Sequence, residues 1–254
     1  MTDIVLIGTG NVARHLFQAF EPQPDLDVIQ VYGRSAKGLD FFKDKTETTS
    51  ELEALLPATV YIICISDDAI DKISQALPFR DRLVVHTSGS IPISALAPHQ
   101  RRGIFYPLQT FSKGVKTDFK QVPLFLEATE QQDLNLLKSI GRAISDTVFE
   151  ADSDQRKQLH LAAVFVNNFP NYMFQIAKEL LEEKNLPFEV LKPLIKETAN
   201  KLESMSPNDA QTGPARRGDK KTLETHEKML KDPKYSEIYR LLSQSIQKHY
   251  GIEL

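Results

Sequence analysis

The chain has 254 residues, 41% of them hydrophobic and 26% charged, which is the composition of an ordinary soluble globular protein with room for two modest domains. Its net charge of −3 at pH 7 argues against nucleic acid as a partner. No apolar run reaches the ~18 residues of a membrane span and no signal segment is visible at residues 1–3, so we expect a cytoplasmic protein that does not enter a membrane.

The first predicted elements are a strand and a helix joined by a glycine-rich turn. Residues 4–7, Ile-Val-Leu-Ile, are typical of a parallel strand buried on both faces. Residues 8–13, Gly-Thr-Gly-Asn-Val-Ala, fit the G-x-G-x-x-G/A fingerprint of dinucleotide-binding turns. The first glycine permits the tight turn, the second lets the backbone approach a pyrophosphate, and the helix N-terminus offers amides to the anion. The residues predicted to bind a dinucleotide are Gly8, Thr9, Gly10, Asn11 and Val12. The alternative is a tight turn without a ligand.

The second strand decides which dinucleotide binds. Residues 27–35 read as a strand that ends at Tyr32 and Gly33. A site for NAD usually has Asp or Glu at that end to accept hydrogen bonds from the ribose 2′-hydroxyl, whereas this chain has Arg34 and Ser35. A guanidinium followed by a hydroxyl suits a 2′-phosphate, so the pair predicts NADP as the cofactor. The alternative is that the arginine is a solvated surface residue.

Strands and helices keep alternating as far as residue 150. The predicted elements are a short helix at about 36–44, a minor strand near 46–48, a helix at 50–56, a buried strand at 59–65, a helix at 66–77, strands within 82–90 and 103–107, a strand at 122–128, a helix at 130–144 and a strand at 146–151. Pro107 must end its strand. Such alternation predicts an α/β fold with a doubly wound, mostly parallel Rossmann-like sheet.

From residue 152 onward the pattern predicts helices only. Asp152 and Gln155 have the spacing of a capping box before a long helix. Further helices are expected at 187–204, 219–231 and 234–249. Residues 204–218 form a broken, weakly hydrophobic stretch that we expect to be a loop. The chain is therefore predicted to have a dinucleotide-binding domain at 1–151 and an all-helical domain at 152–254.

Candidate site residues stand where strands end, because ligands of an open α/β sheet bind outside the carboxyl ends of its strands. His86 stands where it could reach a nicotinamide or a substrate. The alternative is a turn histidine satisfied by nearby backbone. Ser66 and Ser88 are expected to cap a helix and to form a turn, and could also touch the cofactor through a hydroxyl or an amide.

A second candidate region is the apolar helix within residues 158–174. His160 and Asn167 are seven residues apart and therefore lie nearly on one face of that helix. Polar groups in such a helix need partners or face a cavity, so the pair serves catalysis or, alternatively, joins helices in the core. Pro170 is expected to kink or end the helix just beyond Asn168.

Two further observations bear on the chemistry. Residues 212–219 place Arg216 and Arg217 between glycines, where they could clamp an acidic substrate or a phosphate. A solvated loop whose Asp219 caps the next helix is the commoner outcome. The only cysteine, Cys64, lies in a predicted buried strand, and no histidine and acid residues show metal-ligand spacing. We therefore predict neither thiol chemistry nor a metal site.

Seven motifs, spread over nearly the whole chain, carry a resemblance to a known family. They are G-T-G-N-V-A, the Arg-Ser after the second strand, I-S-D-D-A-I, H-T-S-G-S, Y-P-L-Q-T-F, H-L-A-A-V-F-V-N-N-F and T-G-P-A-R-R-G-D. Together they resemble an uncharacterised group of NADP-dependent oxidoreductases with a Rossmann-like N-terminal domain and an all-helical C-terminal domain of unknown function. That group is distantly similar to pyrroline-5-carboxylate reductase and to the 6-phosphogluconate and 3-hydroxyisobutyrate dehydrogenases. The resemblance implies a homodimer whose helical domain completes the active cleft.

The resemblance does not supply a catalytic residue. The β-hydroxyacid dehydrogenases carry a catalytic lysine four residues before an asparagine, and counting back from Asn167 or Asn168 reaches alanine or valine here. His160 could replace that lysine as proton donor, with His86 as the other candidate and Asn167 orienting the substrate. We therefore expect hydride transfer between NADP(H) and a small-molecule carbonyl or imine substrate. The alternative is an NADP(H)-binding sensor or interaction module without turnover.

Overall fold

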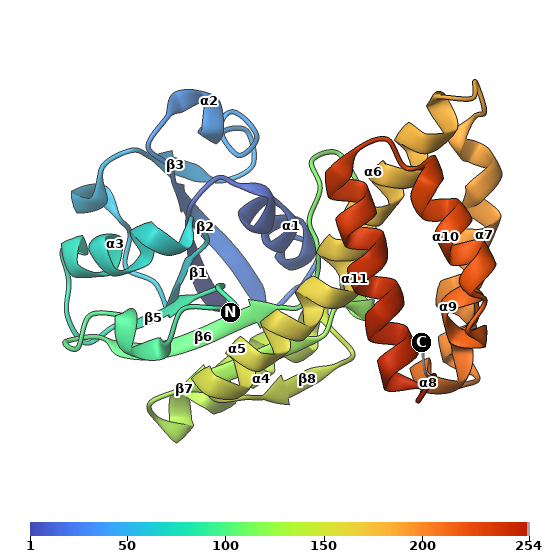
Figure 1. Ribbon diagram of the computed structural model, residues 1–254. Helices are drawn as coiled ribbons and strands as arrows, with labels where there is room; N and C mark the ends of the chain where they lie inside the picture. Colours follow the sequence, from blue (N-terminus) through green and yellow to red (C-terminus); the bar gives the residue numbers. More distant parts are fainter. Residues whose placement is uncertain (253–254) are drawn as a thin grey trace. The chain divides into compact units, whose positions relative to one another are not determined.

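The computed structural model describes residues 1–252 and forms two compact units, Met1–Asn168 and a second unit that begins at Phe169 (Figure 1). The strands of the first unit are β1 (Thr2–Ile7), β2 (Leu26–Tyr32), β3 (Glu47–Thr49), β4 (Val60–Ile63), β5 (Leu83–His86), β6 (Arg101–Pro107), β7 (Leu124–Ala128) and β8 (Val148–Glu150). They form one sheet in the order β3-β2-β1-β4-β5-β6-β7-β8, in which β6 and β7 are antiparallel and all other neighbours are parallel. The predicted doubly wound, mostly parallel sheet is confirmed, and Pro107 ends β6 as expected.

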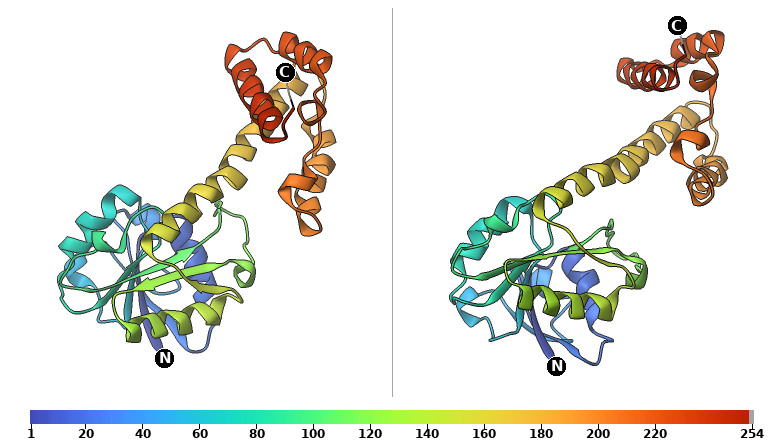
Figure 2. Two further views of the ribbon diagram at one scale, coloured as in Figure 1. Left: turned by 60° about the horizontal axis from the view of Figure 1, so that its bottom comes forward. Right: turned by 90° about the horizontal axis from the view of Figure 1, so that it is seen from below.

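Helices cover both faces of this sheet. They are α1 (Asn11–Phe20), α2 (Ala36–Leu39), α3 (Ile70–Ala76), α4 (Gln131–Ile144) and α5 (Ser153–Ala163). Figure 2 shows α1 and α4 on one face and α3 on the other. In β1, Ile4 and Leu6 belong to the core cluster that includes α1 and α4, whereas Val5 and Ile7 belong to the cluster that includes α3. A strand that is buried on both sides needs an unbroken apolar run, which is what this sequence has.

Three predicted helices of the first unit are shorter than expected. The helix expected at about 36–44 is the four-residue α2. The helix expected at 50–56 is a three-residue 3-10 turn, Leu52–Ala54. Gln30 explains the difference, because its side chain donates to the Ala54 carbonyl and accepts from the Leu56 amide, groups that a longer helix would have paired. Pro57 also disfavours helical backbone at the residue before it. The helix expected at 66–77 begins as a 3-10 turn, Asp67–Ala69, and continues as α3.

The second unit is helical throughout its described residues. Its α-helices are α6 (Phe169–Glu182), α7 (Lys192–Asn200), α8 (Pro207–Ala210), α9 (Pro214–Arg217), α10 (Lys220–Met229) and α11 (Pro233–His249). The expected loop at 204–218 instead contains α8 and α9, each of which begins with a proline. Proline suits the first position of a helix because that position has no intrahelical partner for its amide.

The predicted division at 151/152 marks the place where strands end, whereas the compact units divide at 168/169. The difference lies in α5, which packs with the sheet. Asp152 and Gln155 form the predicted capping box at the start of α5. One turn later, Arg156 is fully buried and binds Glu127 of β7. The secondary-structure pattern and the packing therefore place the boundary differently.

Candidate functional site

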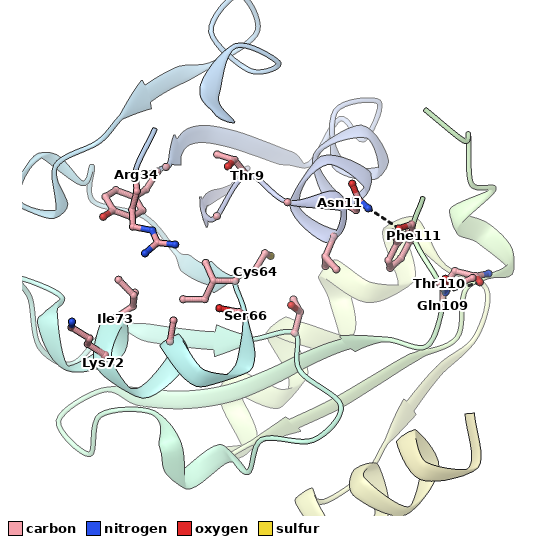
Figure 3. Close-up of a pocket in the computed structure, with 18 residues that line it drawn as sticks. Thr9, Asn11, Arg34, Cys64, Ser66, Lys72, Ile73, Gln109, Thr110 and Phe111 are labelled. Atoms are coloured by element: carbon pink, nitrogen blue, oxygen red, sulfur yellow. Dashed lines mark hydrogen bonds between the residues drawn. The ribbon is translucent and has the colours of Figure 1, made fainter. Parts of the chain in front are cut away.

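A cavity of about 740 Å³ opens at the carboxyl ends of the strands around β1, where the sheet order reverses (Figure 3). Its lining residues are 8–12 after β1, 32–34 at the end of β2, 64–66 after β4, then Ala69, Lys72 and Ile73, then Thr87 after β5, and 109–111 after β6. This switch point is where open α/β sheets bind nucleotides. The cavity belongs entirely to the first unit.

The glycine turn that begins the cavity has the geometry of an anion site. Gly8 has a φ of +133°, and a Cβ there would lie 2.2 Å from the Cys64 carbonyl oxygen, so only glycine fits. A Cβ at Gly10 would meet nothing within 4 Å, which leaves the backbone open towards the cavity. No side chain caps α1, and its first turn contains no acidic residue. The amides of that turn can therefore receive an anion.

Side chains around the turn hold it in place. Thr9 packs against Gly33 and Gly38, where a Cβ would come within 2.5 Å of its side-chain atoms. Asn11 Nδ2 donates to the Phe111 carbonyl 2.9 Å away, which joins α1 to the segment after β6. All five residues predicted from the turn line the cavity. The turn is therefore buttressed by the segments after β2 and β6.

Two cations line the cavity, and none of its lining residues is a carboxylate. Arg34 enters from the end of β2, and Lys72 of α3 lies in the same part of the cavity (Figure 3). Ser35 is not a lining residue, because its hydroxyl caps α2 by accepting from the Gly38 amide 3.2 Å away. Lys72 was not among the residues predicted from the sequence. It is three residues after Ala69, which also lines the cavity, so both lie on one face of the helix.

The two predicted serines differ. Ser66 lines the cavity, but its side chain does not cap the helix that follows. Ser88 is buried, and its hydroxyl accepts from the amides of Ser90 and Ile91, each 3.1 Å away. Ser88 therefore forms the turn after β5 and is not among the cavity-lining residues.

His86 lies in the core with both ring nitrogens engaged. Its side chain is 0% exposed, Nδ1 accepts from the Ser88 amide at 3.2 Å, and Nε2 faces the Pro92 carbonyl at 3.4 Å. Burial, together with the nearby Arg156 cation, lowers the pKa of His86 to about 4. This geometry corresponds to the alternative considered for His86, a turn histidine satisfied by backbone groups.

His160 lies in α5 beside a partner that sequence reasoning missed. Tyr106, at the end of β6, places its hydroxyl oxygen 3.2 Å from Nδ1 of His160. Gly89 lies beneath both rings, since a Cβ there would come 2.7 Å from His160 Nδ1 and 2.8 Å from Tyr106 Cζ. Tyr106 occurs in one of the quoted motifs, but nothing local to it indicates a histidine partner 54 residues away.

Asn167 is not brought together with His160. The regular helix α5 ends at Ala163, and residues Val164–Asn168 form a π-helical turn. A π turn holds more residues than an α turn, so a spacing of seven no longer returns to the same face. Asn167 is exposed on this turn. The helix continues as α6 from Phe169, so Pro170 follows a change in helix type rather than the end of the helix.

A buried arginine fixes the loop after β5. Arg156 donates through Nε to the Ser88 carbonyl at 3.1 Å and through Nη2 to the Ile91 carbonyl at 2.5 Å. Its Nη1 lies 2.5 Å from a carboxylate oxygen of Glu127. Burial of a cation requires such complete pairing. The contacts attach the loop that carries Gly89 to both α5 and β7.

The arginine-rich stretch 212–219 matches its commoner alternative. Asp219 caps α10 by accepting from the Thr222 amide at 3.1 Å. The Arg216 guanidinium carbon lies 4.1 Å from the centre of the Tyr250 ring. Within residues 1–252 no group of three or more His, Cys, Asp or Glu side chains could hold a metal ion. In the same residues, every helix is too short or too polar to cross a membrane.

Known proteins share both the sequence and the fold. Residues 122–246 match the family model of a domain of unknown function, DUF2520. A solved structure from Bacteroides fragilis, provisionally named an NADP oxidoreductase, is 43% identical with a TM-score of 0.89, covering 97% of this chain and 98% of that chain. No protein with a curated functional description matches the chain in sequence.

Two enzymes share the fold at lower identity. A pyrroline-5-carboxylate reductase from Coxiella burnetii is 18% identical with a TM-score of 0.57, covering 98% of this chain and 97% of that chain. A reductive aminase from Aspergillus terreus, solved with NADPH and ethyl levulinate, is 12% identical with a TM-score of 0.71, covering 98% of this chain and 93% of that chain.

Proposed function

Because the chain belongs to the DUF2520 family of Rossmann-like NADP-dependent oxidoreductases, we propose that it transfers a hydride between NADP(H) and a small carbonyl or imine substrate. The observation that carries the proposal is the cavity, which combines an open glycine turn with two cations and no carboxylate. Such a lining suits a ligand with several phosphates.

The residues of the cavity fit the cofactor part by part. The pyrophosphate would lie on the open backbone of Gly10 and the N-terminus of α1. Arg34 and Lys72 would hold the 2′-phosphate that distinguishes NADP from NAD. Ser66, Thr87 and residues 109–111 would border the nicotinamide half. When bound, NADPH supplies a hydride from its nicotinamide ring.

His160 is the proposed source of the proton that completes the reduction. It is partly exposed, lies at the strand ends of the first unit, and is held by Tyr106. His86 is excluded from this role in the proposal because its ring is sealed in the core. The substrate is proposed to be a carbonyl or imine because hydride addition to either leaves an oxygen or nitrogen that needs a proton.

Binding of the two cofactors tests the phosphate assignment. We expect NADPH to bind more tightly than NADH. Arg34→Ala and Lys72→Ala should each weaken NADPH binding by about 5- to 150-fold, since a charged hydrogen bond contributes ~1–3 kcal/mol. Binding of NADH should hardly change. Arg142→Ala is the matched control, because it removes an exposed arginine of the same unit that does not line the cavity. Equal affinities that neither substitution alters would contradict the NADP assignment.

Turnover is tested separately. The parent protein, with NADPH, is incubated with a panel of aldehydes, ketones and cyclic imines while the absorbance of the reduced nicotinamide is followed. Oxidation of NADPH that depends on a panel member supports the proposal. Tight NADPH binding without oxidation by any compound would instead support a binding or sensor protein.

A further inference from the structure

Tyr106 and His160 meet at the carboxyl ends of the strands, close in register to Thr87 of the cavity, and neither is itself a lining residue. The Tyr106 hydroxyl oxygen and His160 Nδ1 are 3.2 Å apart. In the parallel pair β5–β6, His86 is aligned with Ile104. Tyr106, two residues after Ile104, is therefore level with Ser88. Ser88 directly follows Thr87, which lines the cavity. The phenol stands at the strand ends next to the nicotinamide half of the cavity proposed above.

The two side chains differ in their access to water. Tyr106 is 8% exposed, whereas His160 is only half-buried on α5. The absence of a side chain at Gly89 lets both rings approach each other. The arrangement places the phenol on the sheet side and the imidazole on the solvent side, which is the order that a proton path from water to a bound substrate requires.

We infer that Tyr106 is a catalytic residue that gives its hydroxyl proton to the substrate, and that His160 returns a proton to it from solvent; this rests on the proposed hydride transfer. As the substrate carbon gains the hydride, its oxygen or nitrogen takes the proton of the Tyr106 hydroxyl. The phenolate oxygen takes a proton from Nδ1 of protonated His160, and the imidazole regains one from water. In the oxidative direction each proton moves the opposite way.

The charges around the phenol are consistent with this role. Burial raises the pKa of Tyr106, the Arg156 cation acts in the opposite direction, and the Asp67 carboxylate raises it further. The phenol is therefore protonated near neutral pH and available as a donor. Arg156 and His160 are four residues apart on α5, so both lie on the face towards Tyr106. The buried cation would stabilise the phenolate as it forms.

The test compares Tyr106→Phe with Tyr61→Phe. Both substitutions remove one buried hydroxyl from the same sheet, but that of Tyr61 bonds only to the backbone of Leu56 and Ala58. We expect Tyr106→Phe to lower kcat by about 10²- to 10⁴-fold, the usual contribution of a general acid, with NADPH affinity unchanged. Tyr61→Phe should leave kcat unchanged. His160→Gln, which removes the imidazole that returns the proton, should lower kcat less.

A second measurement does not depend on turnover. In the unliganded protein, nitrogen NMR of the histidines should show that Tyr106→Phe shifts the His160 Nδ1 resonance and that Tyr61→Phe does not. A parent that oxidises NADPH with a substrate while Tyr106→Phe keeps its kcat would overturn this inference alone. A parent that binds NADPH and reduces no compound would overturn the proposed function, and this inference with it.

Discussion

Burial gives His86 a measurable influence on stability. Its ring is 0% exposed, and burial lowers its pKa to about 4 in the folded protein, from 6.5 for an exposed histidine. Between pH 6.5 and pH 4 the histidine is mostly protonated in the unfolded chain and mostly neutral in the folded protein. Stability due to the neutral ring is therefore fully present above about pH 6.5 and is lost as the pH falls towards 4, by about 3 kcal/mol in all.

This predicts that the urea midpoint of the parent falls between about pH 7 and pH 4.5 more steeply than that of His86→Gln. The glutamine amide can still donate towards the Pro92 carbonyl but does not titrate. Parallel pH dependences for the two proteins would show that His86 is accessible to protons in the folded state.

The sequence was sufficient to predict the positions of some site residues but not of others. The geometry of the turn at Gly8 and Gly10 could be predicted because a strand, a glycine turn and a helix are consecutive in the chain. His86 could not be placed, because a position at a strand end does not reveal whether a loop seals it. Tyr106 was missed because its partner comes from an element 54 residues later. The orienting role of Asn167 stays a prediction, since its neighbours depend on a π turn that the residue spacing does not reveal.

Helix α5 is attached to the sheet of the first unit by an ion pair between Arg156 and Glu127 of β7. Arg156 is fully buried, and Glu127 and the carbonyls of Ser88 and Ile91 are its partners. Removing Arg156 takes away the donors of these carbonyls and the cation beside Glu127, whereas an exposed ion pair contributes little. The domain boundary predicted from the end of the strands did not include this contact, because a helix that starts with polar residues looks the same in sequence wherever it packs.

We expect Arg156→Leu to lower the free energy of unfolding by about 2–4 kcal/mol, because it leaves the Ser88 and Ile91 carbonyls and the Glu127 carboxylate without the guanidinium. Glu127→Gln should lower it less, because the amide oxygen still accepts from the guanidinium. Lys157→Ala, which breaks the neighbouring exposed pair with Asp154, should change it by less than about 1 kcal/mol. Urea denaturation measures all three. Similar values for Arg156→Leu and Lys157→Ala would mean that the buried pair does not hold α5.

The second unit exposes many large apolar side chains to solvent. Those with at least half of their surface exposed are Leu186, Val190, Leu194, Leu202, Met229 and Leu241. Where exposed apolar side chains form large contiguous patches, they often mark a surface that contacts a partner. Hydropathy alone predicts helices from such residues but not which faces remain free, whereas the strand alternation of the first unit was sufficient to predict its sheet.

We propose that a second copy of the chain covers part of this surface in a two-fold dimer. Light scattering should then report a dimer at micromolar concentration, and Leu194→Lys or Leu241→Lys should shift it towards monomer. Val115→Lys, at an exposed position of the first unit, is the control. A parent that is monomeric at that concentration would contradict the proposal.

Cys64 allows the opening of the carboxyl end of β4, a central strand of the sheet, to be followed by the rate of a chemical reaction. This thiol is the only one in the sequence, it is buried, and it lies where β4 meets the Gly8 turn. Burial raises the pKa of Cys64 to about 12, which leaves very little reactive thiolate at neutral pH and makes alkylation of the native protein slow. Because Cys64 also lines the cavity, the labelling rate of the native protein reports access to the thiol from the cavity together with local opening of this strand end. Labelling should be slow in buffer and fast in denaturant, and NADPH should make it slower than in buffer alone. Because the sequence has one cysteine, the measurement reports a single site and needs no engineered probe.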